Sequence, residues 1–163
     1  MKTINKKKIN KQDHAAIILL YLESYLAEWE KWTQEHITPF VNYLLKRPFK
    51  LKAVVDGKIV WGFISDIKPR HEGNILFDPE IFIHPDYQKQ GFWRQLLQQA
   101  LLQAQQAYQA TDLIAFTFKD SHQLERYQKL GIKTDDSWQM LYGALAPVLG
   151  KLSETTQCNI NAN

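Results

Sequence analysis

The sequence predicts an α/β (α+β) fold, in which a central mixed, twisted sheet with antiparallel N-terminal strands is flanked by helices. Two β-rich runs, at 51–55 and 58–64, flank an Asp-Gly dipeptide, which is the strongest short-range signal for a β-hairpin. Further along, a helical pattern lies between two apolar strand candidates, at 75–83 and 113–118. Helices alternate with strands only in this second half, so an antiparallel front precedes the mixed part of the sheet.

Two helices are expected before the hairpin. Asp13 is a good N-cap for the first helix, and a second, shorter one begins at Thr38-Pro39 as N-cap and first helical residue, ending before Pro48. The expected apolar stripe of the first helix is made of Ile18, Leu22, Tyr25, Trp29 and Trp32. A short first strand is expected ahead of Asp13, around Thr3-Ile4 or Ile9.

The strands that follow carry three local signals. Gly62, inside the second hairpin strand, indicates a bulge or a close approach of another chain segment. Residues 69–74 are expected to form a loop, after which a strand begins at 75–77, is interrupted by Asp78-Pro79 and resumes at Glu80. This strand should end near His84, because Pro85 cannot donate to a β-ladder.

The second half continues with a helix at 92–109, whose glutamines lie mostly off a leucine–alanine stripe and form a solvated face. A buried strand at 113–118 follows, then a helix at 121–130 closed by Gly131, then a last strand at 138–142. We expect one domain over residues 1–145 and a C-terminal tail over 146–163.

Composition argues against several classes of protein. The chain has 163 residues and a net charge of +3, with lysines crowded at the N-terminus in what we interpret as a solvated arm. No basic stripe with interleaved aromatics accompanies it, so no nucleic-acid partner is expected. The apolar run at 15–22 is too short to span a membrane, and the single cysteine, Cys158, fits a reducing cytoplasm. The five histidines have no metal-ligand spacing, so no metal is predicted.

The stretch at 81–97 joins a strand to a helix through a polar loop that contains one glycine, Gly91. Backbone amides at a helix N-terminus have no intrahelical partner, and a loop around them can bind a phosphate. This stretch resembles motif A of the GNAT superfamily of N-acetyltransferases, with Gln88, Gly91 and Trp93 at the three marked positions. The resemblance extends to the order of elements over nearly the whole chain. It implies that the loop binds the pyrophosphate of acetyl-coenzyme A.

The resemblance also implies which residues contact acetyl-coenzyme A: Phe82, Ile83, Gln88, Lys89, Gln90, Gly91, Phe92, Trp93, Arg94, Asp120 and Tyr127. Two of these depart from the family pattern. Asp120 stands where many members have an asparagine, and Trp93 stands where they have a very small residue. Since Trp93 shares the apolar stripe of its helix with Leu97, we expect its indole to pack on the core and to leave the anion site open.

A second local match concerns the chemistry. The segment at 127–132 resembles the family's Tyr-Glu-Lys-x-Gly-Phe, in which the tyrosine protonates the departing thiolate, so Tyr127 is the predicted acid. A carboxylate on the preceding strand often serves as the base, and Glu80 is the first candidate. Weaker candidates for the base are Asp78, His84 and Glu72.

These features predict an acetyl-coenzyme A-dependent N-acetyltransferase that transfers an acetyl group to a primary amine by direct attack in a ternary complex. The acceptor is a small-molecule or peptide amine, and the chain is a monomer or a homodimer. The alternative is a non-catalytic GNAT-like module that binds coenzyme A or has lost it, and Trp93 and Asp120 favour that interpretation. A basic nucleic-acid-binding domain is the third and weakest interpretation.

Overall fold

The computed structural model describes residues 5–26, 32–119, 121–135 and 144–149. The chain divides into two compact units, Met1–Phe116 and Thr117–Asn163, which are treated separately below. No helix within these described ranges is long and apolar enough to cross a membrane.

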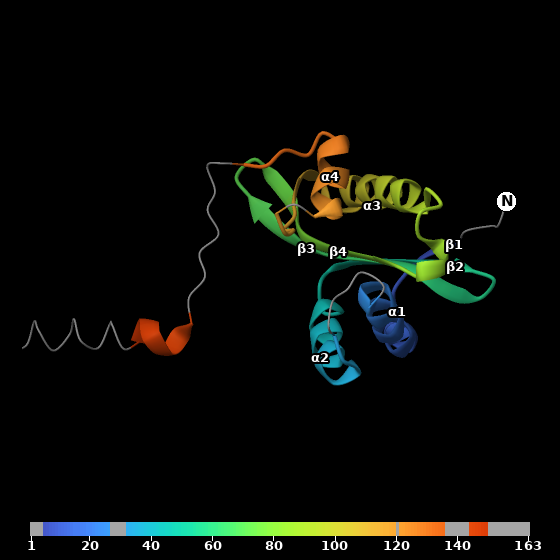
Figure 1. Ribbon diagram of the computed structural model, residues 1–163. Coiled ribbons are helices and arrows are strands. Elements are labelled where there is room, and N and C mark those ends of the chain that lie inside the picture. Colours follow the sequence, from blue (N-terminus) through green and yellow to red (C-terminus); the bar gives the residue numbers. More distant parts are fainter. Residues whose placement is uncertain (1–4, 27–31, 120, 136–143, 150–163) are drawn as a thin grey trace, which may run out of the picture. The chain divides into compact units, whose positions relative to one another are not determined.

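Five strands form a single sheet in the described part of the first unit (Figure 1), and their order in the sheet is their order in the chain. The strands are β1 (Asn5–Lys8), β2 (Phe49–Val55), β3 (Lys58–Arg70), β4 (Gly73–Ile83) and β5 (Ala110–Ile114). Successive strands are antiparallel up to β4, whereas β4 and β5 are parallel. The mixed sheet with an antiparallel front is therefore confirmed.

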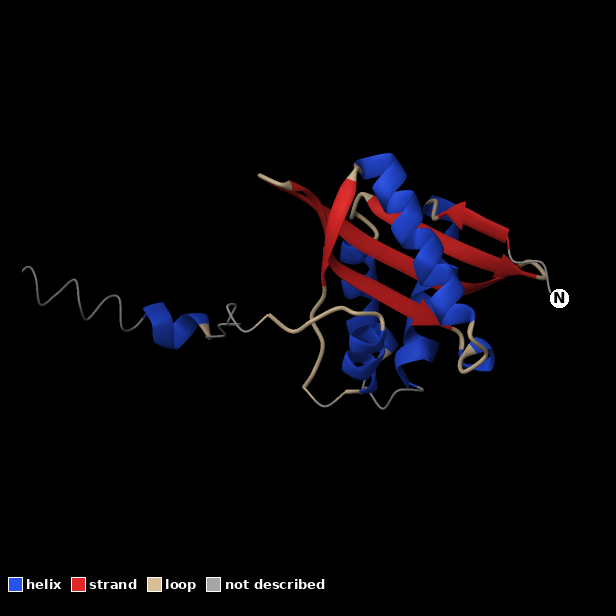
Figure 2. Ribbon diagram, turned by 90° about the horizontal axis from the view of Figure 1, so that it is seen from above, coloured by secondary structure: helices blue, strands red, loops and turns tan. Residues whose placement is uncertain are grey.

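Helices cover both faces of this sheet. Helices α1 (His14–Leu26) and α2 (Gln34–Leu44) lie on one face and α3 (Phe92–Tyr108) lies on the other, where it crosses the strands (Figures 1 and 2). Each face has its own apolar core, one built with Leu96 and Ala100 of α3 and the other with Ile17 of α1 and Val41 of α2. Two short 3-10 turns, η1 (Lys11–Asp13) and η2 (Pro85–Tyr87), precede α1 and α3.

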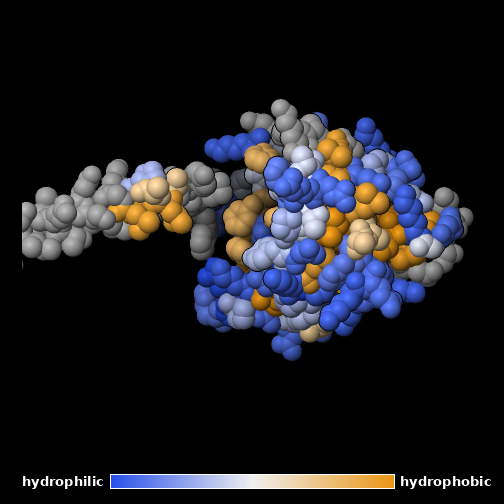
Figure 3. All heavy atoms as spheres, turned by 90° about the horizontal axis from the view of Figure 1, so that it is seen from below, coloured by the Kyte–Doolittle hydropathy of each residue, from blue (hydrophilic) through white to orange (hydrophobic). Residues whose placement is uncertain are grey.

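The buried face of α1 differs from the predicted stripe. Its fully buried residues are Ile17, Leu20, Tyr21 and Ser24, whereas Ile18, Leu22 and Tyr25 are only partly buried. The prediction was wrong because α1 is apolar nearly all round, so apolar spacing alone does not select a face. Figure 3 views the side of the sheet that α1 and α2 cover and shows apolar surface exposed there. Leu19 and Leu26 of α1 are exposed.

The residues that flank α1 lie close to their predicted positions, but not all of them have the predicted role. Asp13 is the last residue of η1 and directly precedes α1. Its carboxylate accepts a hydrogen bond from the Asn10 amide at 2.8 Å and forms an ion pair with Lys52 of β2. Trp29 lies outside the described residues, and Trp32 follows α1 as a partly buried side chain packed on the α1–α2 core. The first strand, β1, falls between the two segments proposed for it, and Ile9 just after it is buried.

Helix α2 begins five residues earlier than predicted. Its N-cap is Thr33, whose hydroxyl accepts a hydrogen bond from the amide of His36, and Pro39 lies inside the helix. The predicted cap Thr38 instead donates its hydroxyl to the Gln34 carbonyl at 2.7 Å, within the first turn. Two threonines of similar capping propensity stand close together here, and the proline beside the second one gave a misleading local signal.

The β2–β3 hairpin follows the prediction. Asp56 and Gly57 both have positive φ angles, of 49° and 81°, as a two-residue hairpin turn requires. Gly62 on β3 marks a close approach, because a Cβ there would lie 2.0 Å from the Phe82 ring. The predicted loop at 69–74 is wrong: β3 and β4 continue through it, and only His71 and Glu72 form the turn.

A β-bulge replaces the interruption predicted at Asp78-Pro79. Strand β4 is continuous, but its register with β3 shifts between Ile64 and Asp66, and Asp78 has a φ angle of 51°. Beyond the bulge the side chains alternate cleanly. Glu80 and Phe82 face α1, while Ile81 and Ile83 pack toward α3. The bulge therefore sets which face of the sheet receives Glu80.

Strand β5 runs from Ala110 to Ile114, so it begins three residues and ends four residues before the predicted strand at 113–118, and 115–118 is irregular. Only Ala110 of this strand is buried, so the prediction of a buried strand was wrong. In the second unit, α4 (His122–Lys129) matches the predicted helix, with Ser121 as its N-cap. Gly131 has a φ angle of 83°, and the Ile132 amide donates to the Tyr127 carbonyl at 3.1 Å, which is a Schellman closure. The last predicted strand, at 138–142, lies outside the described residues.

Candidate active site

The loop between β4 and α3 is fixed by its own side chains. The Gln88 side chain donates from Nε2 to the Ile83 carbonyl at 3.1 Å, and the Gln90 side chain donates from Nε2 to the Asp86 carbonyl at 2.6 Å. The turn η2 adds the hydrogen bond from the Tyr87 amide to the His84 carbonyl, at 2.8 Å. Two glutamine side chains thus brace the loop from within, and Lys89 between them is exposed.

Gly91 stands at the N-cap of α3 in the left-handed conformation, with φ +78°. Glycine adopts this conformation without the steric cost that a Cβ imposes. No side chain caps the helix there, and a Cβ placed on Gly91 would meet nothing within 4 Å. The first-turn amides of α3 therefore begin beside open space, which is the geometry that an anion at a helix N-terminus needs.

Trp93 packs on the core beneath α3 from a partly buried position, as its helical spacing predicted. Phe92 packs on the same core, and Arg94 is exposed. The large indole is therefore accommodated against the apolar residues of the sheet, and the space beside Gly91 is left open. The departure from a small residue at this position is compatible with an open loop.

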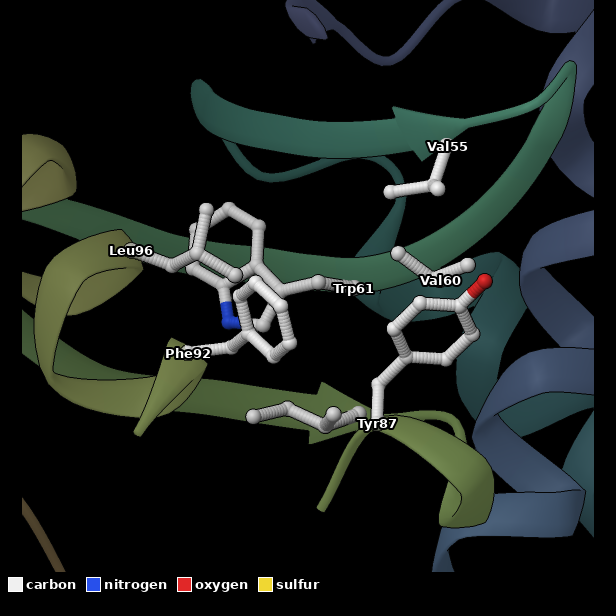
Figure 4. Close-up of a pocket in the computed structure, with 7 residues that line it drawn as sticks. Val55, Val60, Trp61, Tyr87, Phe92 and Leu96 are labelled. Atoms are coloured by element: carbon white, nitrogen blue, oxygen red, sulfur yellow. The ribbon is translucent and has the colours of Figure 1, made fainter. Parts of the chain in front are cut away.

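A small apolar hollow lies beneath this loop, between the sheet and the start of α3 (Figure 4). It is lined by Val55, Val60, Trp61, Ile83, Tyr87, Phe92 and Leu96. Its volume of about 10 Å³ is close to the least that admits one water molecule. Trp61 Nε1 is the one fully buried side-chain polar atom without a hydrogen-bond partner in the described part of the chain. The hollow is too small for a cofactor and belongs to the packing under the loop.

The edge of β4 beyond the bulge has no strand beside it in the described residues. Pairing with β5 ends at Phe77 and Ile114, whereas β4 continues to Ile83. The two parallel strands thus separate, and the backbone of residues 78–83 has no strand partner on that side among the described residues. Side chains hold part of this edge, because the Asp78 carbonyl accepts from Arg47 and the Ile83 carbonyl accepts from Gln88 and Ser24. Such an edge accepts an extended polar chain through main-chain hydrogen bonds. Phe82 and Ile83 lie on this edge, which leads directly into the loop.

Glu80 lies on the same segment of β4, with its side chain turned toward α1. Its Oε2 accepts hydrogen bonds from the hydroxyls of Tyr21 and Tyr25, each at 2.9 Å. Burial raises the pKa of Glu80, and the charge of Asp78 adds to this effect, whereas the two tyrosine hydrogen bonds and Arg47 oppose it. Glu80 is thus a carboxyl group with an elevated proton affinity, which suits a general base.

The other candidates for the base are less suitable. Asp78 forms an ion pair with Arg47, whose NH2 group lies 2.8 Å from Asp78 Oδ2. The buried His84 already accepts a hydrogen bond at Nδ1 from the Asp86 amide, at 3.2 Å. Glu72 lies in the exposed turn between β3 and β4, where its side chain is 82% exposed. Glu80 alone combines burial with hydrogen-bond donors aimed at its carboxylate.

The remaining predicted residues are not brought into this group by the described structure. Asp120 lies outside the described residues, and Tyr127 lies on α4 in the second unit. Sequence reasoning missed the roles of Tyr21, Tyr25 and Arg47. The two tyrosines are four residues apart on one helix, a spacing that places both on one face, but nothing local connects them to Glu80.

The mixed sheet, whose parallel strands separate, thus places an uncapped helix N-terminus near a carboxyl group of raised proton affinity. The sequence model of the acetyltransferase (GNAT) domain matches residues 51–133, half of the chain. The chain therefore belongs to the GNAT family of acetyltransferases and is an N-acetyltransferase of that family. The family prediction is confirmed. No curated protein matches the sequence.

Solved structures of this fold are similar over nearly the whole chain. A possible acetyltransferase from Clostridium difficile 630 has a TM-score of 0.72 at 15% identity, covering 87% of this chain and 98% of its own. Aminoglycoside N-acetyltransferase AAC(6')-Iy in complex with CoA has a TM-score of 0.66 at 14% identity, covering 89% and 97%. A predicted acetyltransferase from Clostridium acetobutylicum with acetyl-CoA has a TM-score of 0.66 at 14% identity, covering 86% and 96%.

Proposed function

We propose that this protein transfers an acetyl group from acetyl-coenzyme A to a primary amine by direct attack in a ternary complex. The observation that carries the proposal is a juxtaposition on one strand. The unpaired edge of β4 leads into the uncapped N-terminus of α3, and the same segment of β4 carries the buried Glu80. The place for the acetyl donor and the general base therefore lie next to each other on β4.

The acetyl donor is held mainly by backbone groups. Amides of the loop and of the first turn of α3 receive the pyrophosphate, contributed by Lys89, Gln90, Gly91, Phe92, Trp93 and Arg94. The Gln88 amide donates to the Pro85 carbonyl, so Gln88 serves the site by bracing the loop with its side chain. The Ile83 amide is the backbone group that hydrogen-bonds the extended part of the molecule, since the Ile83 carbonyl is held by Gln88 and Ser24. Phe82 lies beside it, with its backbone paired to Gly62 of β3. When bound, acetyl-coenzyme A supplies an activated acetyl thioester. Two of the similar structures contain CoA or acetyl-CoA, which supports this assignment.

Glu80 acts as the general base. An amine that arrives as an ammonium ion gives one proton to the Glu80 carboxylate, which becomes a neutral acid, and the freed nitrogen lone pair can then attack. The raised pKa of Glu80 suits this transfer, because a base performs best when its pKa lies near the working pH.

The sulfur of the departing coenzyme A needs a proton, and we assign the donation of this proton to the Tyr127 hydroxyl. Asp120 is retained as a weaker contact to the donor.

The acceptor is a small-molecule or peptide amine. Among the similar structures, one is named an aminoglycoside N-acetyltransferase and another, from Brucella melitensis biovar Abortus 2308, a ribosomal-protein-alanine N-acetyltransferase. The Brucella structure has a TM-score of 0.66 at 18% identity, covering 88% of this chain and 99% of its own. These names span both kinds of acceptor, so a panel for testing should include aminoglycosides, polyamines and peptide N-termini.

The donor site is tested with two nearly isosteric variants at one position. Gly91→Asn keeps the left-handed backbone accessible, because asparagine tolerates that conformation, and Gly91→Asp adds a negative charge of nearly the same shape. In calorimetric titrations, Gly91→Asp should bind acetyl-coenzyme A about tenfold or more weakly than Gly91→Asn, equivalent to about 1.4 kcal/mol or more. Equal affinities would remove the pyrophosphate from this loop.

Catalysis is separated from mere binding by thiol release. The non-catalytic alternative predicts that the chain binds acetyl-coenzyme A but releases no thiol above the uncatalysed rate with any amine of the panel. Our proposal predicts thiol release that depends on the amine and is lost in Glu80→Gln. The matched control is Gln98→Glu, which changes one exposed charge on α3 and should leave the rate unchanged.

A further inference from the structure

The hydrogen bonds of Glu80 are distributed unevenly over its two oxygens. Both tyrosine hydroxyls donate to Oε2, at 2.9 Å each, and Oε1 receives no hydrogen bond from the described residues. Oε2 therefore holds both tyrosine hydrogen bonds, whereas the lone pairs of Oε1 are not used by any described residue.

The donors on Oε2 are held rigidly. Tyr21 and Tyr25 stack at a centroid separation of 4.4 Å, and the Tyr21 ring also contacts Phe40 and Phe82, at 5.8 Å and 5.1 Å. The Tyr21 side chain is 2% exposed. Burial raises the pKa of its hydroxyl, which therefore stays protonated and remains a donor.

Helix α1 is itself tied to β4 beside this cluster. Ser24, between the two tyrosines on α1, shares its one hydroxyl hydrogen between the Ile83 carbonyl, at 2.8 Å, and the Leu20 carbonyl, at 2.7 Å. Ser24 is 4% exposed. This bond fixes the helix against the strand three residues beyond Glu80, so the tyrosines cannot move away from the carboxylate without breaking a buried hydrogen bond.

We propose that Tyr21 and Tyr25 are positioning residues that occupy Glu80 Oε2 and leave Oε1 as the atom that takes the proton from the acceptor. This inference rests on the proposed function, in which Glu80 is the base. In the step, one N–H bond of the acceptor's ammonium group breaks and one O–H bond forms at Oε1. The ammonium becomes a neutral amine and the carboxylate becomes a neutral acid, so charge and atoms balance.

The titratable and charged groups that face Glu80 come from α1, from β4 and from the segment after α2. Tyr21 and Tyr25 of α1 donate to it, Asp78 lies two residues before it on β4, and Arg47 follows α2. Arg47 and Asp78 are paired with one another, so their effects on Glu80 largely cancel. The balance that remains is between burial, which favours the neutral acid, and the tyrosine hydroxyls, which favour the carboxylate.

The test is a carboxyl-carbon NMR titration of the full chain labelled at glutamate side chains, with Glu80→Gln used to identify the Glu80 resonance. Tyr21→Phe and Tyr25→Phe each remove one hydroxyl and keep the ring. We expect the pKa of Glu80 to rise in each single variant and to rise further in the double variant. The acid limb of the pH profile of kcat/KM for thiol release should move to higher pH in the same order.

The matched control is Tyr108→Phe, which also removes one tyrosine hydroxyl, from a hydrogen bond to the Pro48 carbonyl at 3.1 Å, away from Glu80. It should leave the Glu80 titration unchanged. An unchanged or lowered Glu80 pKa in the double variant would overturn the proposal, as would a loss of activity equal at every pH. If the buried Tyr21→Phe variant does not fold, the partly buried Tyr25→Phe variant alone decides.

The inference can fail separately from the function on which it rests. Binding of acetyl-coenzyme A to the same samples, measured by calorimetry, tests the donor site at Gly91 and does not depend on the tyrosines. Absence of binding with a normal Glu80 titration would contradict the proposed function. Normal binding with a Glu80 titration insensitive to both tyrosines would contradict only the positioning role.

Discussion

At the scale of single residues, the sheet is packed so closely around Gly62 that it has no space for a Cβ atom there. A Cβ at this position would lie 2.0 Å from the Phe82 ring, and Phe82 is 1% exposed. The Phe82 ring also contacts Tyr21, which holds Glu80. Packing at Gly62 is therefore connected through two aromatic rings to the carboxylate of the candidate active site.

Gly62→Ala should destabilise the fold by about 2–3 kcal/mol, because the added methyl group overpacks a core that has no space for it. Urea unfolding followed by tryptophan fluorescence measures the change. Adding Phe82→Leu should restore part of the lost stability, since the smaller side chain leaves room for the methyl group. A Gly62→Ala variant as stable as the parent chain would contradict the packing described at this position.

At the scale of elements, Tyr127 is held in a defined place within α4. Its carbonyl accepts the Ile132 amide in the closure of the helix by Gly131, so the residue sits in the last regular turn. Its hydroxyl is the group assigned to the departing sulfur. A residue that acts only on the leaving group stabilises the transition state and contributes little to the binding of the donor.

Tyr127→Phe should therefore lower kcat by about 100-fold while the affinity for acetyl-coenzyme A stays nearly unchanged. Thiol-release kinetics with an accepted amine give kcat, and calorimetry gives the affinity. Gly131→Asn, which keeps the left-handed closure accessible and leaves the hydroxyl in place, serves as the control. An unchanged kcat in Tyr127→Phe would remove this residue from the reaction.

Elements whose signals are local could be predicted from the sequence. The Asp-Gly hairpin and the helix after Gly91 depend on turn chemistry and on a clear apolar stripe, and both were predicted correctly. The buried face of α1 could not be predicted, because α1 is apolar nearly all round. The start of α2 was misplaced because Thr38-Pro39 imitates a helix start inside a helix that Thr33 already caps.

The candidate site also has one part that the sequence could predict and one part that it could not. The loop at 88–94 has a sequence signature, because its glycine and the following helix are contiguous in the chain. The hydrogen bonds to Glu80 from Tyr21 and Tyr25 join residues 59 and 55 positions apart, and they depend on the bulge at Asp78 that turns Glu80 toward α1. A bulge and a contact between distant elements leave no local pattern to recognise.

At the scale of the whole first unit, the sheet separates the two tasks of an acetyltransferase. Helix α3 lies on one face and carries the N-terminus that we propose for the donor, whereas α1 lies on the other face and carries the tyrosines that hydrogen-bond Glu80 (Figure 1). In our proposal strand β4 takes part in both tasks, because its unpaired edge contacts the donor and the side chain of Glu80 acts on the acceptor. The donor and the acceptor can therefore approach one strand from different directions.

The most direct test of this arrangement is the backbone amide spectrum of the full chain, labelled with nitrogen-15 and titrated with acetyl-coenzyme A. We predict that the largest shift changes fall on two stretches, the amides at 88–94 and those at 78–83 along the unpaired edge of β4. Amides of β1, which two strands separate from β4 in the sheet, should change little. Shift changes that are absent, or confined to the lysine-rich N-terminus, would contradict the assignment of the donor site.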